Sequence, residues 1–194
     1  MSSVRVQVGA YSVQLWREEW PSHLDVLMQA ADLAERYGDL RGRNDEDGEL
    51  FAVSISQNGV GSLSSLLTVA QRFSPETPGF EPGVLIVPET SVAFIGAGER
   101  LLAYDLKRAV RLWEDTADAG FWWWDRAGDV VLMAAELELA AWTTTGTRLW
   151  SMFVEPPWSY WLEGDQLNLN VMNVEQTFLV KQGPILKPPA GSSK

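Results

Sequence analysis

An internal repeat is the feature that most constrains how this chain can fold. The stretch 103–113, Ala-Tyr-Asp-Leu leading to Arg-Leu-Trp, recurs at 141–150 as Ala-Trp-Thr-Thr leading to Arg-Leu-Trp. Each copy is followed by a run rich in aromatic residues, at 121–124 and at 158–161, and then by a Gly-Asp turn. A period of about 36 to 38 residues is typical of stacked β units, because one such unit cannot bury its apolar face alone. We therefore expect tandem sheet units built on a common plan.

The N-terminal part of the chain predicts strands and one helix. Apolar and polar residues alternate over 4–8, 11–16 and 50–56, as in half-buried strands, and we favour a strand over a helix for the ambiguous segment 62–73. Residues 22–37 carry an apolar stripe at helical spacing behind an approximate capping box, which predicts an amphipathic helix.

These patterns predict a mainly β protein with a single domain spanning 1–185. Within it, 1–73 holds the N-terminal strands and the helix, and 84–180 holds the blade-like repeats. The segment between them is rich in proline and glycine, and 186–194 is expected to be a flexible tail. We expect an antiparallel meander of blade-like repeats that forms a folded-over sheet or sandwich.

The segment 101–114 resembles the strand–turn–strand signature of PQQ-type (quinoprotein-like) β-propeller blades, and 139–150 is similar to a second copy. The resemblance covers roughly residues 101–180 and implies that Trp113 and Trp150 pack between neighbouring blades. Nothing matches the cofactor ligands of that family, so it implies no cofactor and no enzymatic activity here. Closed propellers use four to eight blades, and two copies cannot close a ring. Self-association through an open sheet edge is therefore the alternative to a folded-over sheet.

Alignment of the two copies separates the aromatic residues into two faces. Trp122 and Trp124 align with aromatic residues in the second copy, so we expect their face to be core. The opposite face is not preserved between the copies. Trp123, Trp161 and Phe121 are therefore the candidate partner-binding residues. The alternative, that this second face packs inside the protein, is equally compatible with the pattern.

The composition of the chain limits the classes of partner that we expect it to bind. A net charge of −11 disfavours nucleic acid and anionic membranes, since both require clustered lysine and arginine. The chain has no cysteine and one histidine, His23, which we expect on the helix surface, and we expect no metal site. No apolar run reaches the roughly 18 residues of a membrane span, and the N-terminus has no pattern of a secretory signal, so we expect a cytoplasmic protein.

Three further motifs match known ligand-binding or catalytic sites only in part. The glycines at 96 and 98 lack the third glycine of a dinucleotide-binding turn, and the acidic loop 45–48 lacks carboxylates at the ends of a calcium loop. Glu136 and Glu138, two apart on a predicted strand, would lie nearly 7 Å apart, a separation within the range of glycosidase carboxylates.

The sequence thus favours a non-enzymatic protein-interaction module, such as an adaptor, an inhibitor or immunity-type protein, or an assembly subunit. Its partner would be another protein, and a basic one would suit the acidic surface. A carbohydrate-binding domain is the alternative, supported by the ten tryptophans. A small glycoside hydrolase using Glu136 and Glu138 is the third hypothesis.

Overall fold

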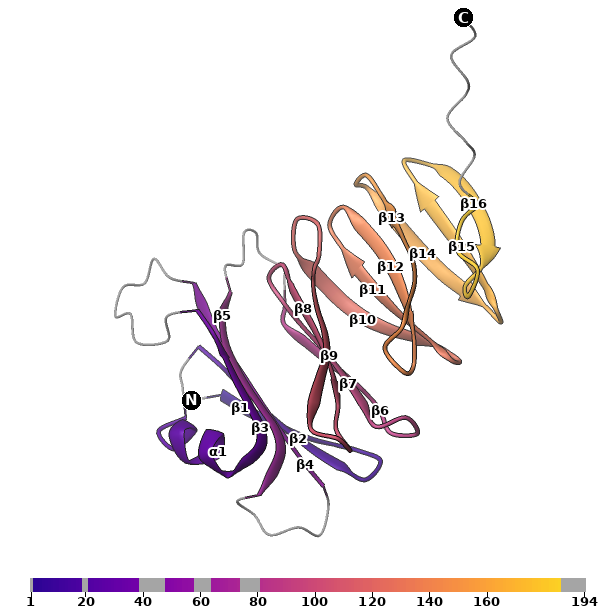
Figure 1. The fold of residues 1–194 in the computed structure, drawn as a ribbon. Coiled ribbons are helices and arrows are strands. Elements are labelled where there is room, and N and C mark those ends of the chain that lie inside the picture. The colour runs from indigo at the N-terminus through magenta and orange to yellow at the C-terminus, as the bar shows by residue number, and fades with distance from the viewer. Residues whose placement is uncertain (1, 19–20, 39–47, 58–63, 74–80, 186–194) are drawn as a thin grey trace, which may run out of the picture.

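Four sheets lie one behind another along the molecule (Figure 1). The structure, a computed structural model, describes residues 2–18, 21–38, 48–57, 64–73 and 81–185. Within these ranges the chain forms mostly strands and one short helix. We call the four sheets the N-terminal sheet and the first, second and third meanders.

The N-terminal sheet has five strands in the order β1-β2-β4-β5-β3. Its strands are β1 (Ser2–Val8), β2 (Tyr11–Arg17), β3 (Ala31–Tyr37), β4 (Glu49–Gln57) and β5 (Ser65–Phe73). Strand β3 pairs in parallel with β5, and every other pair in the sheet is antiparallel. The strand expected over 62–73 is therefore present as β5.

The predicted helix is half as long as expected. Helix α1 spans Leu24–Ala30, and the chain then becomes strand β3. Leu24 and Leu27 pack on the outer face of the N-terminal sheet, beside Trp16. From Ala31 onward burial alternates with a period of two, because β3 gains a backbone ladder along the open side of β5. This pairing across the sheet outweighs the local helical spacing that the sequence shows.

The three meanders follow in chain order as antiparallel hairpins. The first holds β6 (Gly83–Val87), β7 (Val92–Ala97), β8 (Arg100–Asp105) and β9 (Val110–Thr116). The second holds β10 (Phe121–Ala127), β11 (Val130–Ala135), β12 (Glu138–Thr143) and β13 (Arg148–Phe153). The third holds β14 (Trp158–Glu163), β15 (Gln166–Val171) and β16 (Val174–Leu179). The expectation of an antiparallel meander is confirmed.

The two copies of the sequence repeat take equivalent places in the fold. They form the last hairpin of the first meander and the last hairpin of the second. In both hairpins the register shifts at the same point, at Tyr104 and at Trp142. The indole of Trp113 donates to the Gly146 carbonyl at 2.6 Å, and that of Trp150 to the Val180 carbonyl at 2.8 Å. Each repeat thus fastens its sheet to the next one.

Apolar side chains fill the space between each pair of neighbouring sheets. The largest cluster joins the N-terminal sheet to the first meander, and two further clusters join the first to the second and the second to the third. Trp142 is fully buried in the middle cluster, where it stacks on Trp113 with ring centroids 5.3 Å apart. The stack of sheets therefore has a separate apolar cluster in each space between neighbouring sheets rather than one central core.

Candidate functional site

Four aromatic side chains gather where the second and third meanders meet. Trp122 and Trp123 come from edge strand β10, and Trp158 and Tyr160 come from edge strand β14. Trp122 stacks on Trp123 with centroids 5.5 Å apart and on Trp158 at 5.3 Å, and Tyr160 stacks on Trp123 at 6.4 Å and on Trp158 at 6.3 Å. We call these four residues the aromatic cluster.

A β-bulge at the start of β10 decides which of its rings are buried. The register steps from Phe121 opposite Ala135 to Trp123 opposite Ala134, so the simple alternation along β10 is broken. Phe121 and Trp124 consequently share the core between the first and second meanders, and Phe121 is fully buried. The expectation of an exposed Phe121 is therefore wrong.

The other two candidate residues are exposed, on different surfaces. Trp123 is 44% exposed and Trp161 is 41% exposed. Trp123 lies in the aromatic cluster beside Tyr160, whereas Trp161, the next residue along β14, points to the opposite face of the third meander. The structure thus separates the predicted aromatic patch into two surfaces.

Polar contacts hold the aromatic cluster in place. The Trp123 indole donates to the Tyr160 hydroxyl at 3.1 Å, and that hydroxyl donates to the Asp125 carboxylate at 3.1 Å. Burial raises the pKa of Tyr160 above its usual value, so this phenol stays protonated. The indole of Trp158 donates to the backbone carbonyl of Glu136 at 2.9 Å. Hydrogen bonds thus hold Trp123, Trp158 and Tyr160 in addition to the stacking of the four rings.

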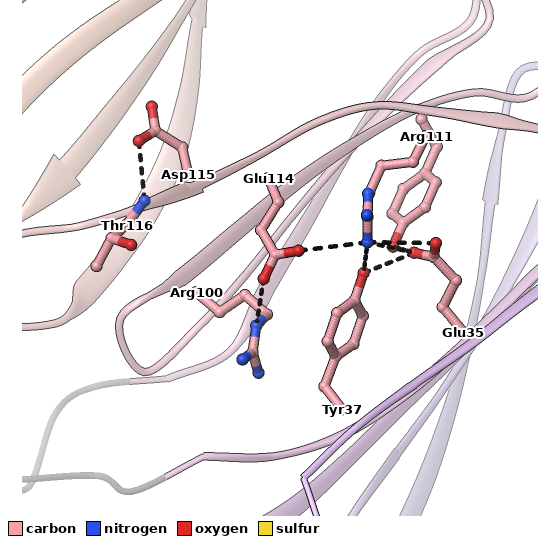
Figure 2. A network of polar contacts seen from close by, with 8 residues as sticks. Glu35, Tyr37, Arg100, Arg111, Glu114, Asp115 and Thr116 are labelled. Carbon is pink, nitrogen blue, oxygen red and sulfur yellow. Dashed lines mark hydrogen bonds and ion pairs between the residues drawn. The ribbon is translucent and has the colours of Figure 1, made fainter.

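A second polar group, shown in Figure 2, joins the N-terminal sheet to the first meander. Glu35 of β3 accepts hydrogen bonds from Tyr37 at 2.7 Å and from Tyr104 at 2.6 Å, and it pairs with Arg111 at 3.3 Å. Arg111 also donates to the Tyr37 hydroxyl. We call Glu35, Tyr37, Tyr104 and Arg111 the carboxylate clasp.

Further ion pairs connect the carboxylate clasp to residues that line a polar hollow of about 300 Å³. Glu114 pairs with both Arg111 and Arg100, and the Arg100 guanidinium lies over the Tyr37 ring, 4.5 Å from its centroid (Figure 2). Arg100 and Glu114 line this hollow together with Phe73.

The two phenols of the carboxylate clasp act as hydrogen-bond donors to Glu35. Burial raises the pKa of Tyr104 and of Tyr37, so both phenols remain hydrogen-bond donors at neutral pH. Neither is therefore poised as a nucleophile, which would need a lowered pKa or a free adjacent base. The arrangement instead neutralises one partly buried carboxylate with two donors and a cation.

The expected carboxylate pair is not present as drawn. Glu138 begins β12, whereas Glu136 precedes that strand, so the two do not follow each other along one strand face. Glu138 is buried, pairs with Arg148 at 2.9 Å, and has its pKa raised by burial. Arg148 also reaches Asp115 at 2.9 Å. Arg148 therefore joins Glu138 of its own meander to Asp115 of the first meander.

The remaining motifs resolve simply. The glycines at 96 and 98 lie at the end of β7 and in its turn to β8, and His23 is exposed at the start of α1. The acidic loop 45–48 lies mostly outside the described residues, and the tail 186–194 lies wholly outside them. Across the described ranges, no three histidine or acidic side chains are grouped so as to hold a metal ion, and no helix is long and apolar enough to cross a membrane.

Sequence reasoning missed the carboxylate clasp entirely. Tyr104 and Arg111 belong to the first copy of the sequence repeat, but Glu35 lies 69 residues before Tyr104, and no motif connects β3 to that repeat. Glu35 and Tyr37 in particular fall within the segment predicted as helix, where their shared face could not be foreseen. The only local signal was their two-residue spacing.

Comparison with known proteins identifies no family for this chain. No family model matches it, and no curated protein matches it. Among solved structures, hydrazine synthase from Kuenenia stuttgartiensis is similar with 11% sequence identity and a TM-score of 0.44. The match covers 74% of this chain and 46% of the hydrazine synthase chain, less than half of its length. The resemblance to PQQ-type blades therefore stays a prediction.

Proposed function

We propose that this protein is a non-enzymatic protein-interaction module, cytoplasmic as the sequence predicts, that binds a basic segment of a partner protein at the aromatic cluster. The observation that carries the proposal is a four-ring stack with an exposed tryptophan, Trp123, on two adjacent sheet edges. Tryptophan is enriched among the residues that dominate binding energy, because it buries a large area at little entropic cost.

Charge favours a basic partner segment. The face of an indole attracts lysine and arginine side chains, and the Asp125 carboxylate lies within the same contact network, bonded to Tyr160. The whole chain carries a net charge of −11, which steers a cationic partner toward it. A partner arginine stacked on Trp123 would gain both contacts together.

We expect Trp123→Ala to weaken binding of a basic peptide at least tenfold, because it removes the exposed ring that the cation would face. The measurement begins with selection of random 12-residue displayed peptides on the wild-type protein. Calorimetric titration of the enriched peptides then compares the wild type and the variant at low and at high salt. Enriched peptides should be rich in lysine and arginine, and high salt should weaken their binding.

Trp161→Ala is the matched control, because it removes the same residue type at nearly the same exposure, 41% against 44%, from a different surface. Its affinity for the selected peptides should equal that of the wild type. Failure to enrich any basic peptide, or equal affinities for all three proteins, would contradict the proposal.

A carbohydrate-binding function is the second candidate, and the outer face of the third meander favours it. Trp161 pairs with Asn168, which pairs with Thr177, so an indole, an amide and a hydroxyl form one row across the sheet. The hydroxyl of the exposed Thr177 donates to the Asn168 side-chain oxygen at 2.6 Å. A sugar ring could stack on the indole while its hydroxyls bond to this hydroxyl and amide oxygen.

Titration with a panel of soluble oligosaccharides, followed by tryptophan fluorescence, tests this second candidate. A saturable shift that Trp161→Ala abolishes and Trp123→Ala preserves is the expected result if the outer face binds sugar. The absence of any saturable shift across the panel would remove the carbohydrate hypothesis and leave the peptide-binding proposal untouched.

A further inference from the structure

We propose that β1 of one copy of this protein pairs with β16 of a second copy and completes its third meander. The first and second meanders each have four strands, whereas the third has three among the residues that the structure describes. The place beside β16 corresponds to the fourth strands β9 and β13. An antiparallel strand added there would give the third meander the composition of the other two.

The edge of β16 is open to such a strand. No strand in the described ranges pairs with it on the side away from β15. Most of its side chains are exposed, including Val174 at 70%. The edge carries neither lysine nor proline, the residues with which proteins commonly block strand addition. Backbone groups along β16 are thus available as a template.

Phe178 shows which face of β16 an added strand would extend. The second and third meanders share an apolar cluster. The last strand of the third meander continues that cluster through Phe178. An added strand should therefore present apolar residues at alternate positions on this same face, with polar residues on the other.

Strand β1 has this pattern, and no described strand pairs with its outer side. Val4 and Val6 lie on one face of the N-terminal sheet, opposite Leu15 and Val13, yet they are 55% and 44% exposed. The side chains that bury Val13 do not cover Val4 and Val6. On the other face Arg5 provides a positive charge. A pair of exposed valines on an edge strand leaves apolar surface that another strand can cover.

The two edges are complementary in an antiparallel register. Placing Val4 beside Phe178 and Val6 beside Gln176 puts apolar groups on the face that looks toward the second meander. The same register places Arg5 beside Thr177 and diagonal to Glu175, where opposite charges attract. This pairing uses different surfaces of the two copies, so it is heterologous and can add copy after copy.

Two edge variants test the proposal. In the first, Val4→Lys and Val6→Lys block β1, and in the second, Val174→Lys and Gln176→Lys block β16. All four positions are exposed, so both variants should fold, which circular dichroism and thermal unfolding will verify. Sedimentation equilibrium then gives the mass of each protein against the 21.6 kDa chain.

The wild type should form assemblies that grow beyond a dimer as its concentration rises, and each variant alone should assemble at least tenfold more weakly. An equimolar mixture of the two variants should form dimers and nothing larger, because pairing joins the free β16 of the first variant to the free β1 of the second and leaves only blocked edges. A wild type that stays monomeric, a variant that assembles alone as the wild type does, or a mixture that stays monomeric would each overturn the proposal. Trp123→Ala should assemble like the wild type, so failure here is distinct from failure of the peptide-binding proposal.

Discussion

Phe121→Ala should lower the free energy of unfolding by about 3 to 5 kcal/mol, the range typical of a phenylalanine lost from a packed core. Phe121 is fully buried between the first and second meanders and lies in contact with Trp124, with centroids 5.2 Å apart. The backbone at Gly96 approaches its ring so closely that a Cβ there would stand 2.6 Å from the ring. Chemical denaturation of the wild type and the variant measures the difference.

Two controls define this prediction. Trp123→Ala, two residues along the same strand, should cost clearly less, about 1 kcal/mol, because Trp123 is 44% exposed whereas Phe121 is fully buried. Gly96→Ala should destabilise the wild type by about 1 to 3 kcal/mol through overpacking, and should be tolerated when Phe121 is also alanine. Equal losses for Phe121→Ala and Trp123→Ala would show that the bulge does not separate these two rings as described.

Tyr104→Phe should lower the free energy of unfolding by about 2 kcal/mol, the typical value for a hydrogen bond to a charged group. The hydroxyl of Tyr104 donates to the Glu35 carboxylate at 2.6 Å, in surroundings where Tyr104 is fully buried. Removing it leaves that carboxylate with Tyr37 and Arg111 as partners and with less compensation for its burial.

A double-mutant cycle with Glu35→Gln isolates this contact from simple loss of the hydroxyl. Tyr104→Phe should cost clearly less in the Glu35→Gln background, because the charge that the hydroxyl stabilised is already absent. Strictly additive losses in the cycle would mean that the two residues do not interact, and the carboxylate clasp would lose its central member.

The sequence predicted well where the pattern was local. Strand alternation identified β1, β2 and β4, and the repeated Arg-Leu-Trp element located the last hairpins of two meanders, because side-chain periodicity and turn residues act over a few positions. The exposure of Trp123 and of Trp161 also followed from the comparison of the copies.

The failures all arose where distant segments meet. The helical stripe over 22–37 is real in the sequence, yet β5 draws its second half into a strand by offering an unpaired edge. Alternation along 121–124 predicted an exposed Phe121, and one bulged residue reversed that assignment. Neither the pairing of β3 with β5 nor the bulge in β10 is marked by a local sequence pattern that would predict it.

By itself the sequence determined that this is a mainly β protein of tandem units joined by tryptophans, since periodicity and composition suffice for that. Only the tertiary structure decided which rings meet in the aromatic cluster, how Glu35 contacts two tyrosines and an arginine, and that the third meander has, among the described residues, one strand fewer than its neighbours. The physical reason is that these features depend on packing and strand pairing between residues far apart in the chain. A local sequence pattern does not show how much free energy such contacts contribute.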